Sequence, residues 1–126
     1  MRAVDTNVLV RLVTRDNERQ VTAANLFIQQ GVWVSHLVLA ETVWVWNKTY
    51  GLSHADIAAA IDLLVNNERV TLQDLDVLIN ALEHYRRKPR MGFSDCLILE
   101  IARKAGHLPL GTFDRDLGKL EGAERL

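Results

Sequence analysis

Four acidic side chains, Asp5, Glu41, Asp95 and Asp114, occupy positions at which carboxylates can bind a metal ion. Asp5 and Asp114 each follow a short apolar segment that predicts a strand, and ligands of open parallel sheets bind at the carboxyl ends of strands. If the two segments are neighbouring central strands, as a switch-point topology would place them, the two carboxylates meet in one cleft. Each is also placed to cap the turn or helix that follows it, and Asp116 competes with Asp114 for that role.

Glu41 lies in a predicted helix over residues 36–48. The side chains three and four positions away from it are all apolar: Leu37, Val38, Trp44 and Val45. This pattern predicts that the Glu41 carboxylate is at least partly buried, where an unpaired charge is costly. A structural salt bridge is the alternative to a metal ion, although no basic residue follows in this helix before Lys48.

Asp95 follows Ser94 at the start of another predicted helix. Ser94 is a candidate N-cap, which leaves Asp95 free to face inward, three residues before Ile98 on a predicted core-facing stripe. Stabilisation of an acidic group by the helix start is the alternative interpretation of Asp95.

Crowding of these four carboxylates would be unfavourable without a cation. At ~4 Å and an effective dielectric constant near 20, each like-charge pair costs up to about 4 kcal/mol. The set contains no histidine or cysteine, and all-oxygen ligands are typical of Mg²⁺ or Mn²⁺. The chemistry that such a set predicts is metal-assisted hydrolysis of a phosphodiester, in which the ion lowers the pKa of a bound water.

Short apolar runs alternate with longer segments of helical period along the chain, which predicts an α/β fold with a central parallel sheet of four to five strands flanked by helices. The expected strands are residues 2–4, 32–35, 70–73 and 108–111, with the C-terminal tail as a fifth. Three apolar stripes predict helices: Ile57, Ile61 and Leu64; Leu78, Ala81, Leu82 and Tyr85; Ile98, Ile101, Ala102 and Ala105. Pairs of helices are expected between successive strands.

The 126 residues suit one domain, 1–126, with 48% hydrophobic and 25% charged residues. A net charge of −1 excludes a global positive field, so a polyanion must be held by a local patch or a metal. The single cysteine, Cys96, forms no internal disulfide, and no apolar stretch is long enough for a membrane span. We therefore expect a cytoplasmic protein that does not enter a membrane.

The sequence resembles the PIN-domain ribonucleases, and within them the VapC-type toxins of toxin-antitoxin modules. The matching segments are Asp5-Thr6-Asn7 after the first strand, Leu39-Ala40-Glu41 in an apolar helix, Ser94-Asp95 at a helix start, and Thr112-Phe113-Asp114-Arg115-Asp116 after the fourth strand. The resemblance extends over nearly the whole chain, from Met1 to about Leu120. All four segments in this order are specific, whereas Asp-Thr-Asn alone is weak.

This resemblance implies a Mg²⁺- or Mn²⁺-dependent endoribonuclease with a cognate antitoxin as partner. Its catalytic, metal-binding acids would be Asp5, Glu41, Asp95 and Asp114, with Asp116 as a further acid or as the fourth member in place of Asp114. Polar supports would be Asn7, Ser94 and Thr112.

A basic run lies between two predicted helices and contains Arg86, Arg87, Lys88 and Arg90. It predicts an RNA phosphate-binding rim, aided by Arg11, Arg15 and Arg115, or else compensation of a helix dipole. The helix that contains Trp44 and Trp46 is apolar nearly all round, so we expect a homodimer or a bound partner chain to cover part of it.

Three other interpretations remain. A haloacid-dehalogenase-like phosphatase needs Asp-x-Asp after its first strand, and position 7 is asparagine. A receiver-type phosphorylation switch has only Asp74 to support it. A non-catalytic PIN-like RNA- or protein-binding module keeps the fold and loses the metal. No serine, cysteine or histidine has a convincing base beside it, and Cys96 is expected to be a core residue.

Overall fold

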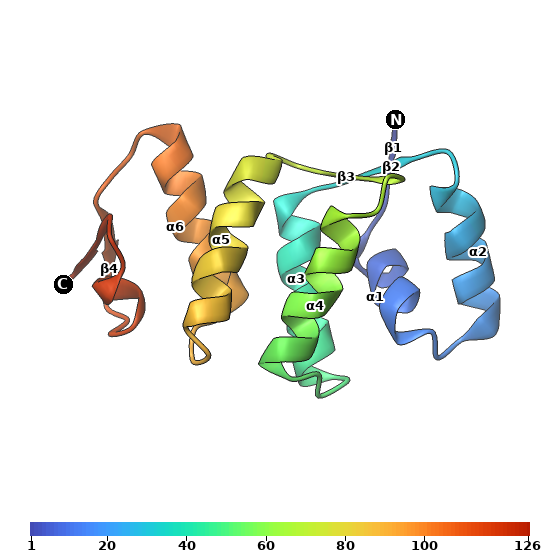
Figure 1. Ribbon diagram of the computed structural model, residues 1–126, viewed down its shortest axis with the longest axis horizontal. Helices are drawn as coiled ribbons and strands as arrows, with labels where there is room; N and C mark the ends of the chain where they lie inside the picture. Colours follow the sequence, from blue (N-terminus) through green and yellow to red (C-terminus); the bar gives the residue numbers. More distant parts are fainter. The chain divides into compact units, whose positions relative to one another are not determined.

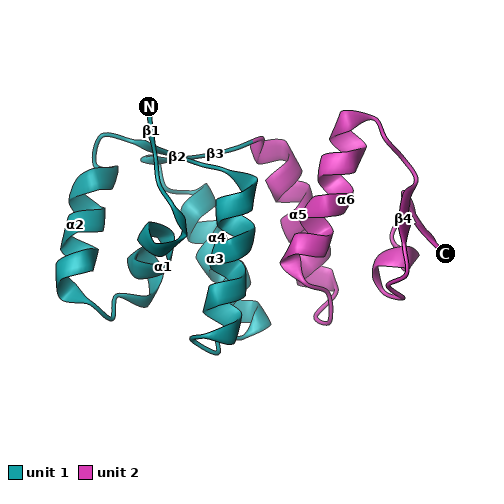
Figure 2. Cartoon of the chain, turned by 180° about the vertical axis from the view of Figure 1, so that it is seen from behind, with its two compact units in different colours: residues 1–73 teal, residues 74–126 magenta.

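The computed structural model describes all residues from 1 to 126 and divides into two units, Met1–Gln73 and Asp74–Leu126 (Figure 2). Five short strands and six α-helices alternate along the chain (Figure 1). The strands all pair in parallel, so the predicted α/β class is confirmed. They form one sheet of three strands and one of two.

The first unit contains the three-stranded sheet, in the order β1-β2-β3. Its elements are β1 (Arg2–Ala3), α1 (Thr6–Thr14), α2 (Glu18–Ile28), β2 (Val32–Val34), α3 (His36–Lys48), α4 (His54–Val65) and β3 (Val70–Leu72). A pair of helices separates each strand from the next, as predicted. This long connection is what parallel pairing requires, because the chain must return to the same end of the sheet.

Alternation along the strands explains which face of this sheet is covered. Val32 and Val34 of β2 are buried, as are Val70 and Leu72 of β3, whereas Trp33 between the valines is 38% exposed. Successive strand residues point to opposite faces, so the buried set packs against the helices on one side (Figure 1).

Capping side chains set the helix starts of this unit. The Ser35 Oγ accepts a hydrogen bond from the Val38 N–H (3.1 Å) and begins α3, and the Ser53 Oγ accepts one from the Asp56 N–H (3.1 Å) and begins α4. The predicted stripe Ile57, Ile61 and Leu64 is buried on α4.

The second unit consists of α5 (Leu75–Arg87), α6 (Phe93–Ala105), β4 (Leu110–Thr112), the 3₁₀ helix η1 (Leu117–Lys119) and β5 (Ala123–Arg125). Helices α5 and α6 pack side by side (Figure 1), with the Tyr85 and Phe93 rings edge to face at 5.6 Å between centroids. Strand β4 starts at Leu110, two residues later than predicted, because Pro109 has no N–H to donate to a ladder. No helix in the chain has the length and apolar character needed to cross a membrane.

The core faces of α5 and α6 differ in how well the sequence predicts them. The stripe of Leu78, Ala81, Leu82 and Tyr85 on α5 is buried as expected. The predicted stripe on α6 is wrong: Ile98 and Ile101 are 49% and 41% exposed, and the buried side chains are Phe93, Cys96, Leu97, Leu99 and Glu100. The spacing of apolar residues favours the opposite face of α6, because Glu100 counts as polar in that pattern. In the structure, ion pairs allow the Glu100 side chain to lie in the core.

Helix α3 provides a matched pair of tryptophans for testing this packing. Trp46 is fully buried and Trp44 is 61% exposed, as their positions on opposite helix faces predict. We expect Trp46→Ala to lower the free energy of unfolding by about 3–5 kcal/mol, because it leaves a large cavity. Trp44→Ala should change it by about 0.5 kcal/mol or less. Urea denaturation of both variants measures the difference, and equal losses would contradict this assignment of the core.

Candidate metal-binding site

Asp5 lies between β1 and α1, where the chain turns from strand to helix. Its Oδ1 accepts a hydrogen bond from the Val8 N–H (3.4 Å), so Asp5 is the N-cap of α1. The side chain is exposed, and no hydrogen bond occupies Oδ2. Capping therefore uses one carboxylate oxygen and leaves the other available for a cation.

Glu41 projects from α3 and is exposed, so the prediction that its carboxylate is buried is wrong. The apolar neighbours on which that prediction depended are themselves uncovered: Leu37 is 76% exposed and Trp44 61%. The buried side of α3 is formed by Leu39, Thr42, Val43 and Trp46 instead.

Thr6 connects the two acids of the first unit. Its Oγ1 donates a hydrogen bond to the Glu41 Oε2 (2.5 Å), which holds a carboxylate of α3 next to the residue that follows Asp5. Sequence reasoning assigned a supporting role to Asn7 and none to Thr6. The signal for Thr6 was its hydroxyl directly after the first acid, at the start of a helix.

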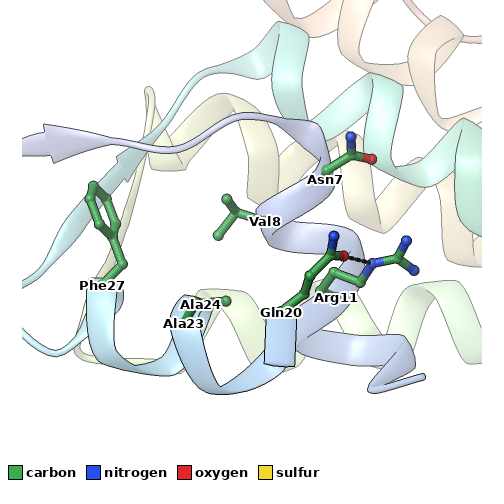
Figure 3. Close-up of a pocket in the computed structure, with 7 residues that line it drawn as sticks. All are labelled: Asn7, Val8, Arg11, Gln20, Ala23, Ala24 and Phe27. Atoms are coloured by element: carbon green, nitrogen blue, oxygen red, sulfur yellow. Dashed lines mark hydrogen bonds between the residues drawn. The ribbon is translucent and has the colours of Figure 1, made fainter. Parts of the chain in front are cut away.

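Asn7 is one of the residues that line a cavity of about 320 Å³ formed by α1 and α2 (Figure 3). Arg11 also lines this cavity. Its guanidinium donates to the side chains of Gln20 (2.5 Å), Asp16 (2.8 Å) and Tyr50 (2.5 Å), which tie together α1, α2 and the segment after α3.

Asp95 lies on the first turn of α6 and is partly buried. The predicted N-cap, Ser94, is wrong: α6 begins at Phe93, with Gly92 as the N-cap and its carbonyl accepting from the Cys96 N–H (3.4 Å). Ser94 is exposed on the same turn. Burial raises the pKa of the Asp95 carboxyl above its ordinary value, and the negative charge of Asp114 raises this pKa further.

Asp114 is held in a turn directly after β4. Its N–H donates to the Thr112 Oγ1 (3.0 Å), and its Oδ2 accepts from the Leu117 N–H (2.7 Å) at the start of η1. Thr112 thus supports Asp114, while Asp116 makes no side-chain cap at its position. Of these two acids, Asp114 is the one whose charge acts on Asp95.

Two of the four acids lie in each unit: Asp5 and Glu41 in the first, Asp95 and Asp114 in the second. Strand β1 pairs with β2 in the first unit, and β4 pairs with β5 in the second. No three Asp, Glu, His or Cys side chains lie together as a group that could hold a metal ion. The Asp95–Asp114 pair nevertheless fits a hard divalent cation, because it offers oxygen donors and a repulsion that a positive charge relieves.

The basic run lies at the C-terminal end of α5 and in the loop that leads to α6. Arg86, Arg87, Lys88 and Arg90 are all exposed, and Arg87 forms an ion pair with Glu83 one turn earlier (2.7 Å). This position suits compensation of the α5 dipole, and it also places the basic residues shortly before Asp95 in the same unit.

Cys96 is a core residue, as expected. It is fully buried, and burial together with the nearby Asp95 charge raises the pKa of its thiol to about 12. A thiol with such a pKa is not a nucleophile near neutral pH.

Asp95 and Asp56 provide a matched test of carboxylate repulsion, because each is the third residue of its helix. The pKa of Asp95 is raised on folding, so its charged form destabilises the fold. The folded protein is therefore most stable with respect to Asp95 at low pH, where the carboxyl is protonated. Its free energy of unfolding decreases as the pH rises from the ordinary aspartate pKa through the raised one. At pH 7 in chelator, Asp95→Asn should melt at or above the parent temperature, whereas Asp56→Asn should lose a favourable helix-dipole interaction. Thermal unfolding measures both, and a marked loss for Asp95→Asn would make its carboxylate a structural group.

A family model of the PIN domain matches residues 2–123. No curated protein matches the chain. Among solved structures, the chain is similar to VapC20 of Mycobacterium tuberculosis, described as a toxin that cleaves the sarcin-ricin loop, with 24% identity and a TM-score of 0.45 over 94% of this chain and 93% of that one. Because the family model covers nearly its full length, this chain belongs to the PIN-domain family.

Proposed function

We propose that this chain, as a single PIN domain over residues 1–126, is a Mg²⁺- or Mn²⁺-dependent endoribonuclease and the toxin of a VapBC-type toxin-antitoxin module. The observation that carries the proposal is Asp95, a partly buried carboxylate at a helix start, whose pKa is raised by burial and further by the charge of Asp114. The order of the four acidic motifs along the chain, in a member of the PIN family, supports it. Family membership also sets aside a haloacid-dehalogenase-like phosphatase.

The residues that would hold the cation are Asp5, Glu41, Asp95 and Asp114. Bound there, a divalent cation supplies the Lewis acidity and the charge neutralisation that phosphodiester hydrolysis needs. The chain's own polar groups orient these ligands. Thr6 holds Glu41 through Oε2, and Thr112 fixes the turn in which Asp114 uses only Oδ2 for capping. Asn7, Ser94 and Asp116 would be polar groups around the site.

RNA would be held by the exposed basic residues Arg86, Arg87, Lys88 and Arg90. A protein with a net charge of −1 repels a polyanion weakly at long range, so a local patch is needed to bind phosphates. The patch is in the same unit as Asp95 and Asp114, and its guanidinium groups suit phosphate oxygens.

A cognate antitoxin and a second copy of the chain are the proposed protein partners. Exposed apolar side chains on α3, Leu37 and Trp44, support a protein-covered surface. We also propose that the protein acts in the cytoplasm, where its unpaired Cys96 would remain reduced.

Metal-dependent cleavage is the direct test. Purified protein should cleave RNA with Mg²⁺ or Mn²⁺ and stop in excess chelator. Asp5→Asn and Asp95→Asn should each lower the cleavage rate on the order of 100-fold or more, because charge stabilisation in the transition state is lost. Asp56→Asn, at the same helical position as Asp95, is the control and should retain activity.

Two results would contradict this function. Full cleavage in chelator would remove the metal from the mechanism. RNA binding without cleavage at any metal concentration would favour the non-catalytic binding module.

The basic patch makes a separate prediction about salt. Replacing Arg86, Arg87 and Lys88 with alanine should weaken the binding of single-stranded RNA and make it less dependent on salt. The slope of log K against log salt concentration should become shallower by about 0.7 for each phosphate that is no longer neutralised. Arg19→Ala with Lys48→Ala, two exposed basic residues of the first unit, is the control. Fluorescence anisotropy over a salt series gives the slope, and an unchanged slope would leave these residues as dipole compensation only.

A further inference from the structure

Glu100 is the one charged side chain in the buried core of this protein, with 3% of its surface exposed. It faces α5 from the middle of α6. Its Oε2 lies 2.9 Å from the His84 Nε2, and the Arg103 Nε donates to both of its carboxylate oxygens at 3.2 Å. A buried carboxylate with this many partners is fixed in place, because moving it would leave a charge without compensation.

Arg103 extends this cluster from α6 to the C-terminal segment. Its Nη2 donates to the Glu121 carbonyl oxygen at 2.6 Å, so one guanidinium contacts Glu100 on one side and the backbone before β5 on the other. Gly122, the next residue, has a φ of +94°, and a Cβ there would lie 3.0 Å from the Arg103 Nη2. Glycine at this position therefore provides both the left-handed backbone and the space for the guanidinium.

The backbone at Glu121 and Gly122 is linked in turn to Asp114. The Leu110 N–H donates to the Gly122 carbonyl oxygen (2.8 Å), which joins this point to the start of β4. Strand β4 ends at Thr112, whose Oγ1 accepts from the Asp114 N–H. Hydrogen bonds at both ends of β4 therefore link Gly122 to Asp114.

Asp95 lies at the other end of the same helix. It precedes Arg103 by eight residues of α6, a rise of roughly 12 Å along a rigid helix. The guanidinium of Arg103, held by Glu100, thus connects the helix that carries Asp95 to the segment that is linked to Asp114.

We propose that Glu100 and Arg103 are positioning residues that hold Asp114 at the separation from Asp95 that a shared divalent cation needs. The inference rests on the proposed metal-dependent function and assigns to this site two residues that are outside its acidic motifs. Neither residue touches the cation or the RNA. They act through Glu121, Gly122 and β4.

Mn²⁺ alone is the probe for this role. Arg103→Met should weaken Mn²⁺ binding, measured by calorimetry, about tenfold or more, as loss of groups that orient ligands commonly does. Arg103→Lys should recover part of the affinity, because an ammonium can still contact Glu100 or the Glu121 carbonyl. Lys104→Met is the control: Lys104 is adjacent on α6 and pairs with Asp74 and Asp76 instead.

A spectroscopic readout separates positioning from a general loss of stability. In NMR spectra of the parent, paramagnetic Mn²⁺ should broaden the amide signals of both Asp95 and Leu117. The Leu117 N–H is the one that donates to the Asp114 Oδ2. In Arg103→Met the Asp95 amide should remain broadened at saturating Mn²⁺, while the Leu117 amide recovers intensity. Gly122→Ala keeps the Glu100 and Arg103 side chains but places a Cβ against the Arg103 guanidinium, so it should show the same pattern. This variant replaces Arg103→Met if Arg103→Met does not fold.

The outcomes distinguish this inference from the proposed function. A parent that binds Mn²⁺ and a folded Arg103→Met or Gly122→Ala variant with parental affinity and both amides broadened would overturn the positioning role alone. A parent that binds no Mn²⁺ at all would overturn the metal site, and the positioning role with it.

Discussion

The negative charge of Asp114 acting on the partly buried carboxyl of Asp95 is the interaction that gives this structure its chemical character. Asp95 and Asp114 come from a helix start and from a turn after a strand, and neither is neutralised by a basic side chain. The fold thus retains an unfavourable interaction that a short sequence change, aspartate to asparagine, would remove. A protein keeps such a pair most readily where a cation completes it, since stability and ion binding then depend on the same two charges.

The acidic residues also stabilise local structure, so capping and metal binding are not exclusive alternatives here. Asp5 accepts from the backbone of α1 through Oδ1, and Asp114 accepts from the start of η1 through Oδ2. In each case a backbone N–H fixes the carboxylate with one oxygen and leaves the second oxygen uncommitted. Helix starts and strand ends suit metal ligands for this reason: the unpaired N–H groups needed to orient an acidic side chain are already there.

The sequence predicted the elements well and the burial of individual faces less well. Residues 36–48 are predicted as a helix and form α3, whose N-cap is Ser35. The environments of Glu41 and Ile98 were mispredicted because apolar neighbours show that a face is apolar, and not that another part of the chain covers it. The burial of Glu100 is not predicted by the sequence pattern either. Its burial depends on His84 and Arg103, and ion pairs of that kind leave no periodic signal.

The Glu100–Arg103–Gly122 contact also limits how this sequence can diverge. Loss of Arg103 leaves a buried carboxylate with only His84, loss of Glu100 leaves a guanidinium without its counter-charge, and any side chain at position 122 meets that guanidinium. Each of these replacements made alone gives a less stable protein. Replacing all three residues together by apolar residues of similar volume could fill the same space without that loss. Among descendants of this chain, positions 100, 103 and 122 should therefore change together, while the exposed Lys104 beside them varies on its own.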